Sequence, residues 1–239
     1  MFILILGLGR TGKNLAKLAL ADSHQVAGTT QKPDQKLLDL GVIPIIWSSK
    51  DGTQSLPDAD RVICAFPPSD LYPVQLAALF SRYPTTPIVQ ISSTGVFGAN
   101  TGLISEETQP IANDARSNLL YQAEIEVANQ PNGHIVRAAG LYDDDNHPIH
   151  FISGKKDIKN PKGNINLVHR EDLAEIIYQL ILQESIAKIT HAVNPHHPSR
   201  EEYYQGKAKK LNLPIPLFKD DEKVEKVITS RLKRNWRDL

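Results

Sequence analysis

The stretch that decides the fold is Phe2-Ile3-Leu4-Ile5-Leu6-Gly7-Leu8-Gly9-Arg10-Thr11-Gly12. Its first five residues form a continuous apolar run, which is typical of a strand buried on both faces of a parallel sheet. Three glycines follow in the spacing G-x-G-x-x-G. A helical pattern over residues 11–21 then begins at once, with Leu15, Leu18 and Ala19 on one face. The sequence therefore predicts a strand, a tight turn and a helix in direct succession.

The three glycines indicate a phosphate-binding turn. Gly7 permits the tight turn itself, Gly9 lets the backbone approach a pyrophosphate, and Gly12 lets the helix pack closely on the strand. The first backbone amides of the helix, from Arg10 and Thr11 onward, would face that anion. A turn that binds nothing is the alternative, but such a turn needs one glycine rather than three in register. We therefore expect these five residues to hold a dinucleotide cofactor.

Outward from this turn, short apolar runs alternate with helical patterns. The expected strands are residues 2–6, 25–29, 43–47, 61–66, 87–91 and 134–138. The expected helices are residues 11–21, 69–82 with Ser69 as the N-terminal cap, 170–182, and a short basic helix at 230–236. Strands separated by helices predict a parallel sheet with helices on both faces, because parallel neighbours need long crossovers. The expected fold class is α/β, a Rossmann-type doubly wound parallel sheet with a small C-terminal substrate lobe.

The pattern loosens after Gly140, which marks the start of the lobe. An acidic run at 143–145 and a stretch rich in Gly, Lys and Asn at 154–166 follow there. The expected divisions are a dinucleotide-binding Rossmann core at 1–142, a small substrate lobe at 143–164 and 196–239, and a return to the core at 165–195.

The segment that ends the second expected strand bears on which dinucleotide is bound. An NAD site usually places an acidic residue here to hydrogen-bond the ribose 2′-hydroxyl. This chain instead has Thr29-Thr30-Gln31-Lys32 and no carboxylate before Asp34. Arg10 and Lys32 could flank a 2′-phosphate, and the two threonine hydroxyls could donate to it. We expect NADP, with NAD as the alternative cofactor; simple solvent exposure of the two basic residues is the competing interpretation.

The amino-acid composition limits the kinds of binding partner that we expect. Lys and Arg total 27 and Asp and Glu total 27, so no net charge would attract nucleic acid or an acidic membrane surface. The single cysteine, Cys64, lies in an apolar run, where a small buried hydrophobe is expected rather than a nucleophile. No apolar stretch has the length of a membrane helix or the pattern of a signal peptide. We expect a cytoplasmic protein with a small-molecule partner; the oligomeric state is left open.

Six segments that follow or form the expected strands and helices match sequence motifs of one known family. They are residues 65–68 (AFPP), 91–98 (ISSTGVFG), 137–142 (RAAGLY), 166–174 (NLVHREDLA), 193–195 (VNP) and 199–204 (SREEYY). With the glycine turn, they resemble the extended short-chain dehydrogenase/reductase family, especially its atypical members related to nucleoside-diphosphate-sugar epimerases. The resemblance spans nearly the whole chain. It implies an NAD(P) cofactor that also contacts Phe66, Pro67 and Pro68, and a further strand and helix around residues 193–204.

The resemblance also implies a catalytic apparatus. In the family a tyrosine exchanges a proton with the substrate as hydride moves to or from the nicotinamide. A lysine four residues later lowers the pKa of that tyrosine, and a Ser or Thr hydroxyl orients the substrate oxygen. Ser93 matches the hydroxyl position, whereas the tyrosine and lysine positions hold Arg116 and Leu120. Because arginine stays protonated near neutral pH, it cannot act as the general acid or base.

Tyr121 is not an obvious substitute for the missing tyrosine. Five residues along a helix amount to about 500°, which turns its side chain roughly 140° from the expected face. A shifted alignment would bring Tyr121 into play but would leave Ile125 where the lysine is needed. The ordinary mechanism of the family is therefore in doubt for this chain.

Four residues are further candidates for substrate binding. Arg116 could bind an anionic group, or it could be an exposed residue at the start of a helix. Arg137 and Tyr142 flank the point where the sixth expected strand ends, and His169 ends a returning strand; each could face a substrate or serve the structure. No metal site is expected, because the adjacent carboxylates at 143–145 are typical of a solvated loop.

Two functions remain open on the sequence. The first is an NAD(P)-dependent reductase or epimerase-like enzyme acting on a small, for example sugar-derived, substrate, with Ser93 polarising a carbonyl in a non-standard mechanism. The second is a regulatory or sensor protein that keeps the cofactor site and has lost the chemistry.

Overall fold

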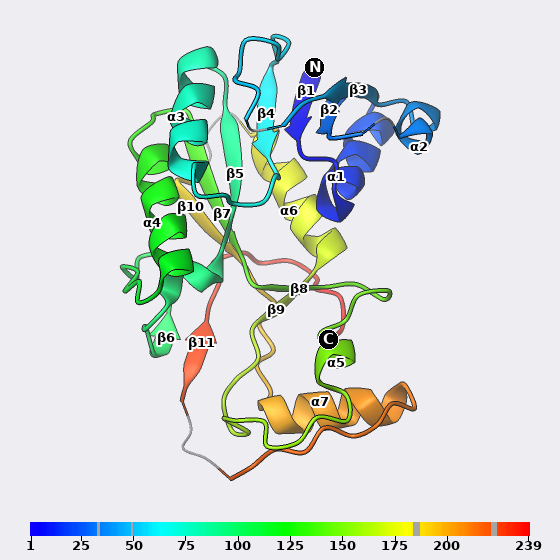
Figure 1. Cartoon of the computed structure of the whole chain (residues 1–239), viewed down its shortest axis with the longest axis vertical. Coiled ribbons are helices and arrows are strands. Elements are labelled where there is room, and N and C mark those ends of the chain that lie inside the picture. Colours follow the sequence, from blue (N-terminus) through cyan, green and yellow to red (C-terminus); the bar gives the residue numbers. More distant parts are fainter. Residues whose placement is uncertain (33, 49, 184–186, 221–223) are drawn as a thin grey trace.

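A parallel sheet of seven strands runs through the middle of the molecule (Figure 1). The structure is a computed structural model and describes residues 1–32, 34–48, 50–183, 187–220 and 224–239. The strands of the sheet are β1 (Phe2–Leu6), β2 (Gln25–Thr30), β3 (Ile43–Ile46), β4 (Arg61–Cys64), β5 (Ile88–Ser93), β7 (Gly133–Ala138) and β10 (Ile189–Ala192), in the spatial order β10-β7-β5-β4-β1-β2-β3. The α/β fold class with a doubly wound parallel sheet is confirmed.

Two helical layers cover the sheet. The main helices are α1 (Arg10–Ala21), α3 (Tyr72–Arg82), α4 (Ala115–Ala128) and α6 (Arg170–Ile181), and a short α2 (Gln35–Asp39) precedes β3. Helices α1 and α6 pack together on one side of the sheet, and α3 and α4 pack together on the other (Figure 1). In β1, Ile3 and Ile5 join the first layer while Leu4 and Leu6 join the second. The apolar run therefore belongs to two cores, as expected for a strand buried on both faces.

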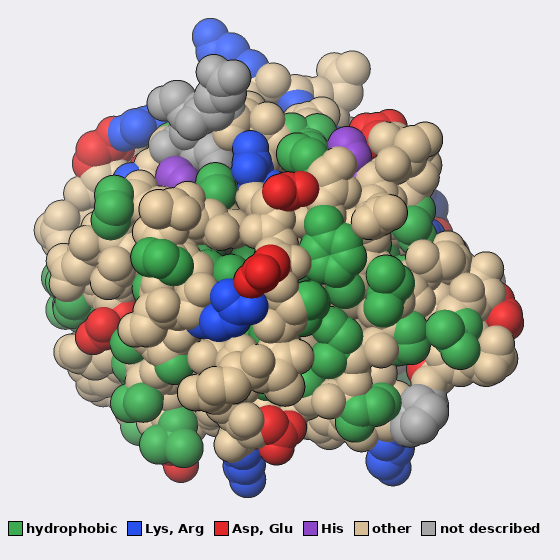
Figure 2. Space-filling model, turned by 90° about the horizontal axis from the view of Figure 1, so that it is seen from above, with side chains coloured by type: hydrophobic (Ala, Val, Ile, Leu, Met, Phe, Trp, Pro, Cys, Tyr) green, Lys and Arg blue, Asp and Glu red, His purple; other side chains and the backbone are tan. Residues whose placement is uncertain are grey.

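The order in which the chain adds strands to the sheet reverses at β1. From β1 it moves to β2 and β3 on one side, and it then returns to β4 and β5 on the other side. A crevice opens at the carboxyl ends of the strands at such a switch point, and this is where open α/β sheets bind ligands. Figure 2 looks onto the opposite end, where the strands begin; there apolar side chains and both signs of charge are interspersed.

A smaller lobe lies beyond the carboxyl ends of the strands (Figure 1). It contains α5 (Ile149–Ile152) and α7 (Arg200–Lys210), and two short parallel strands, β8 (Gly140–Tyr142) and β9 (Leu167–His169), connect it to the main sheet. A third apolar cluster, which includes Tyr142, Ile149 and Tyr204, holds the lobe together. The strands β6 (Gly102–Ile104) and β11 (Lys226–Ile228) form a separate two-stranded parallel sheet. In the described ranges no helix has the length and apolar composition needed to cross a bilayer.

The expected helix at 230–236 is wrong. These residues have no regular secondary structure, and Arg234 and the following Arg237 bind acidic residues of α6. Arg234 Nη2 lies 3.0 Å from the fully buried Asp172 carboxylate, and Arg237 Nη2 lies 2.7 Å from Glu175. The expected cap at Ser69 is also wrong: α3 begins at Tyr72, and the Ser69 carbonyl accepts the Tyr72 amide in the preceding turn.

Candidate functional site

The glycine turn between β1 and α1 is too tight for side chains at two of its positions. Gly7 has a φ of 103°, and a Cβ on it would lie 2.8 Å from the Phe66 nitrogen. A Cβ on Gly12 would lie 2.2 Å from the Gly7 carbonyl oxygen. Glycine at both positions lets the start of α1 pack directly against β1 and the segment after β4.

Gly9 differs from the other two glycines because it faces open space. A Cβ built on Gly9 would meet no atom within 4 Å. Gly9 is the N-cap of α1, no side chain caps the helix start, and the first turn carries no acidic residue. The first amides of α1 are thus available to an external anion, and the open backbone lets that anion come close. The turn therefore fits the pyrophosphate of a dinucleotide.

A cavity of about 470 Å³ lies on one side of the turn, between the ends of β2 and β4. Its lining residues are Gly7, Leu8, Gly9, Thr29, Thr30, Gln31, Trp47, Ser48, Lys50, Phe66, Pro67, Pro68 and Ser69. The Trp47 and Phe66 rings meet edge to face with centroids 5.9 Å apart, and Trp47 Nε1 donates to the Gly52 carbonyl. The wall is rigid and aromatic, which suits a planar base. Sequence reasoning missed Trp47, which lies just after β3.

The two threonines at the end of β2 support the turn and their own loop. Thr29 is buried, and its hydroxyl accepts a hydrogen bond from the Gly7 amide at 2.8 Å while its carbonyl accepts the Leu8 amide. The Thr30 hydroxyl donates to the Lys32 carbonyl at 2.9 Å. Thr29 therefore shapes the glycine turn from behind, and the Thr30 hydroxyl proton is already used by the backbone.

The first carboxylate after β2 is already engaged. Asp34 caps α2 by accepting the Lys36 amide, and Lys13 of α1 donates to it at 2.9 Å. The hydrogen bond from Lys13, which outweighs the opposing effect of burial, lowers the pKa of Asp34. This carboxylate is thus held between two helices by Lys13 and the Lys36 amide.

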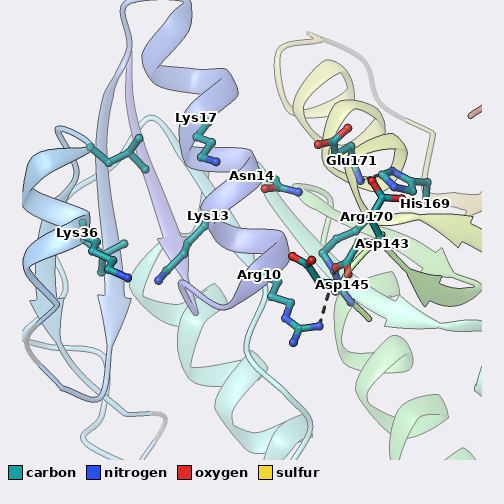
Figure 3. Close-up of a pocket in the computed structure, with 13 residues that line it drawn as sticks. Arg10, Lys13, Asn14, Lys17, Lys36, Asp143, Asp145, His169, Arg170 and Glu171 are labelled. Carbon is teal, nitrogen blue, oxygen red and sulfur yellow. Dashed lines mark hydrogen bonds and ion pairs between the residues drawn. The ribbon is translucent and has the colours of Figure 1, made fainter. Parts of the chain in front are cut away.

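Basic side chains line a second cavity, of about 480 Å³, along α1 (Figure 3). Arg10, Lys13 and Lys17 lie on one wall with Lys36 of α2. The acidic residues Asp143, Asp145 and Glu171 lie on the opposite wall, beside the start of α6. Arg10 is 58% exposed and comes no closer than 4.0 Å to Asp143. Its guanidinium therefore remains free to meet a phosphate near the turn.

Arg170, the first residue of α6, joins the turn to the lobe. Its Nε donates to Asp143 at 2.7 Å and its Nη1 donates to the Thr11 hydroxyl at 3.2 Å. Burial favours the neutral acid, but the hydrogen bond and charge of Arg170 prevail and lower the pKa of Asp143. Sequence reasoning missed Arg170, although its place directly after β9 was available as a signal.

A third cavity, of about 290 Å³, extends from the glycine turn to the expected catalytic positions. Its lining residues are Gly9, Arg10, Thr11, Gly12, Ala65, Phe66, Pro67, Pro68, Ile91, Ser92, Ser93, Arg116, Leu120, Leu141 and Arg170. None of these described residues is Asp, Glu, His, Cys, Lys or Tyr. The lining thus brings Ser93, Arg116 and Leu120 together and offers no side chain that exchanges a proton near neutral pH.

Ser93 is the last residue of β5 and caps the short helix η1 (Thr94–Phe97). Its Oγ accepts the Gly95 amide at 3.1 Å, so the hydroxyl proton stays available to a ligand. Leu120 is buried on α4, one turn after Arg116, so the two share a face of the helix. Tyr121 packs partly buried against the core and lines none of the cavities described here.

The remaining candidates have structural partners. The Arg137 guanidinium lies in the core against Glu124 and reaches none of these cavities. The Tyr142 hydroxyl donates to the Asp238 carbonyl, and burial raises the pKa of Tyr142 to about 12. His169 caps α6 through Nδ1, which accepts the Glu171 amide at 3.3 Å, and its ring borders the basic cavity. Within the described part of the chain, no three His, Cys, Asp or Glu side chains group closely enough to hold a metal.

The chain has the same fold as solved proteins described as an NAD-dependent epimerase/dehydratase and a short-chain dehydrogenase/reductase superfamily member, as the sequence resemblance implied. An SDR-superfamily protein from Agrobacterium tumefaciens, solved with bound NAD, matches with a TM-score of 0.79 and 14% identity over 96% of this chain and 89% of that one. Human epimerase family protein SDR39U1, solved with NADPH, matches with a TM-score of 0.71 and 18% identity over 91% and 83%.

Closer sequence similarity identifies the family. The chain is 31% identical over 242 residues to Protein YeeZ of Escherichia coli K12, covering 91% of this chain and 86% of that protein. It belongs to the same family as YeeZ. A conserved protein of unknown function from Silicibacter pomeroyi has the same fold, with a TM-score of 0.80 and 20% identity over 96% of this chain and 89% of that one. No protein-family profile matches the sequence.

Proposed function

We propose that this protein binds NADP(H) in the crevice at the carboxyl ends of β1, β2, β4 and β5. The observation that carries the proposal is the uncapped start of α1 beside Gly9, where the backbone is open and no acidic side chain competes with an anion. Two proteins of the same fold were solved with NAD and with NADPH. The pyrophosphate would lie against the first amides of α1, with Arg170 supplying positive charge from the opposite side.

The two flanking cavities suit the two ends of such a cofactor. The aromatic wall of Trp47 and Phe66 would hold the adenine, since flat rings stack on or against a base with little loss of entropy. The cavity with Ser93 and Leu120 would hold the nicotinamide end. When bound, the cofactor would supply a hydride donor or acceptor at that end.

The charges near the end of β2 favour NADP over NAD. Asp34, the first carboxylate after β2, already accepts hydrogen bonds from Lys13 and the Lys36 amide, which compete with a 2′-hydroxyl. Lys32, two residues after β2, and Arg10, beside the glycine turn, are both exposed and would attract a 2′-phosphate.

Titration with NADPH and NADH, followed by nicotinamide fluorescence, tests the proposal. Wild-type protein should bind NADPH more tightly than NADH. The substitution Lys32→Gln should weaken NADPH binding by about tenfold, because a charge-assisted contact contributes roughly 1.5 kcal/mol, and should leave NADH binding nearly unchanged. Lys209→Gln, which removes an exposed charge on α7, is the control. Failure of the wild-type protein to bind either dinucleotide would refute the proposal.

Two roles for the bound cofactor follow from the third cavity. We propose binding without the family's usual proton transfer, which is favoured because Arg116 and Leu120 replace the tyrosine and lysine and no other lining residue titrates near neutral pH. The second candidate is a reductase or epimerase-like enzyme for a small, for example sugar-derived, molecule. It is supported by the free proton of the Ser93 hydroxyl, which could hold a carbonyl oxygen while water supplies the proton. Loss of NADPH fluorescence with added carbonyl compounds would favour the second role.

The location proposed for this function is the cytoplasm. The single cysteine, Cys64, is buried in β4 and has no second cysteine with which to form a disulfide, which suits a reducing compartment.

A further inference from the structure

Arg116 is a charged side chain with no fixed partner beside a largely apolar cavity. It is the second residue of α4 and is exposed. No hydrogen bond or ion pair to a described residue engages its guanidinium, and only its charge acts on the neighbouring Asp114. An unpaired cation on a cavity wall is a binding point for an anion, since the guanidinium stays charged at any physiological pH.

The other two guanidiniums of this cavity are differently placed. Arg170 is held by Asp143 and Thr11, and Arg10 lies near the same carboxylate at the glycine turn. Both therefore belong to the phosphate end of the cleft. Arg116 lies on α4, on the same helix face as Leu120, which reaches the turn that carries Ser93. The two ends of the cavity thus have separate positive charges.

Ser93 adds a neutral donor near Arg116. A Cβ on Gly95 would lie 3.3 Å from Ser93 Oγ and 3.7 Å from Leu120 Cδ1, so the face of α4 that carries Leu120 closes against the turn that carries Ser93. Arg116 lies one helical turn before Leu120 on that face. The cavity wall thus offers one planar charged fork and one hydroxyl proton within the same small space.

We propose that a second ligand of this cleft carries a carboxylate, which Arg116 binds, and an adjacent oxygen that accepts from Ser93. The inference rests on the proposed function only in taking the glycine-turn end to be occupied by the dinucleotide. A carboxylate matches the guanidinium fork through two parallel hydrogen bonds. A phosphate dianion fits less well, because Arg116 supplies one charge and the other cations of the cavity are at the turn.

Pyruvate is a suitable probe because its carboxylate adjoins a carbonyl oxygen, and methyl pyruvate is the matched probe without charge. Each is titrated into the wild-type protein with and without saturating NADP⁺, and binding is followed by ligand-observed NMR. Pyruvate should bind more tightly than methyl pyruvate. Arg116→Gln should weaken pyruvate binding by about tenfold or more, the effect of losing a charge-assisted hydrogen bond, whereas Arg116→Lys should retain part of it. Lys209→Gln should bind pyruvate like the wild type.

Several results would overturn the inference. They are no detectable pyruvate binding by the wild type, equal binding of pyruvate and methyl pyruvate, equal binding by wild type and Arg116→Gln, and tighter binding of inorganic phosphate than of pyruvate. Loss of NADP⁺ affinity in Arg116→Gln would also overturn it, since Arg116 would then contact the cofactor. Failure of NADP⁺ to bind the wild type contradicts the proposed function alone, and the titration without NADP⁺ then decides the carboxylate site. Circular dichroism of each variant verifies that it is folded.

Discussion

Arg137 and Glu124 form an ion pair inside the protein: Arg137 Nη2 lies 2.7 Å from Glu124 Oε2, and both side chains are 3% exposed. Arg137 Nε also donates to this carboxylate, and the Ser92 hydroxyl donates to it at 2.6 Å. The Arg137 guanidinium stacks over the Phe97 ring at 4.8 Å. The pair thus connects β7 and α4 to the end of β5 through Ser92, the residue before Ser93.

Removing one member of this pair should destabilise the fold strongly. Arg137→Met leaves a buried carboxylate without its cation, and we expect the free energy of unfolding to fall by about 3–5 kcal/mol. Urea unfolding followed by circular dichroism measures it. The double variant Arg137→Met with Glu124→Leu removes both charges and should lose less than Arg137→Met alone. A double variant as unstable as the sum of the single ones would show that the two residues act independently.

Substitutions at two glycines of the turn should have different effects, one on stability and the other on ligand binding. Gly12→Ala places a methyl group on the Gly7 carbonyl oxygen and should cost about 1–3 kcal/mol or more of unfolding free energy. Gly9→Ala meets no protein atom, so unfolding should change little, while NADPH affinity should fall by about tenfold or more because the methyl group occupies the approach of the pyrophosphate. Thermal unfolding and fluorescence titration measure the two effects.

Gly206 is the control for the glycine series. It lies within α7, and a Cβ there would meet nothing within 4 Å. Gly206→Ala should raise the unfolding free energy by about 1 kcal/mol through helix propensity and leave NADPH affinity unchanged. If Gly9→Ala binds NADPH as well as Gly206→Ala does, the pyrophosphate does not lie on the turn.

Lowering the pH should destabilise the folded protein through His147, which lies in the lobe. Burial, with smaller effects from Lys207 and His150, lowers the pKa of His147 from 6.5 to about 4. Between these values the unfolded chain binds a proton here that the folded chain does not, so the unfolding free energy falls as the pH is lowered, by roughly 3 kcal/mol in all. His147→Asn should flatten the dependence of thermal stability on pH between 7 and 4. His150→Asn removes only one of the smaller effects on His147 and should change this dependence far less; equal slopes in both variants would refute the assignment.

Cys64 should be unreactive in the folded protein. It is fully buried in β4, and burial raises the pKa of its thiol to about 12. A thiol reagent should modify almost none of the native protein and one thiol per chain in denaturant, since the thiolate is the reactive form. Rapid modification without denaturant would contradict the burial of this strand.

The sheet was largely predictable because its strands are apolar on both faces. The run 2–6 matches β1 at both ends, and no end of the other expected strands of the sheet differs from the structure by more than two residues. Strand β10 is different, because Thr190 and His191 interrupt its apolar character. The family resemblance implied a strand at 193–195, but β10 ends at Ala192 just before those residues. His191 is tolerated in the core because its Nδ1 pairs with the Thr229 carbonyl.

The direction of individual side chains was less predictable than the position of the elements. Thr29 was expected at the cofactor, but its hydroxyl faces back to the Gly7 amide. Arg137 was a candidate for the substrate, but it finds its carboxylate thirteen residues earlier in the chain, on α4. Such pairings depend on which helix packs on which strand. Neither the spacing of residues nor the composition of the chain predicts this packing. Arg170 and Trp47 were missed for the same reason.

The bonds of Arg170 have a thermodynamic consequence. One guanidinium holds both Thr11 in the glycine turn and Asp143 at the entrance to the lobe. An anion at the turn that draws Arg170 toward itself therefore changes how firmly the lobe is attached. By reciprocity, a ligand that engages Asp143 changes the affinity of the turn for its anion by the same factor. Arg170 is thus a side chain through which an anion at the glycine turn and a ligand at Asp143 would change each other's affinity.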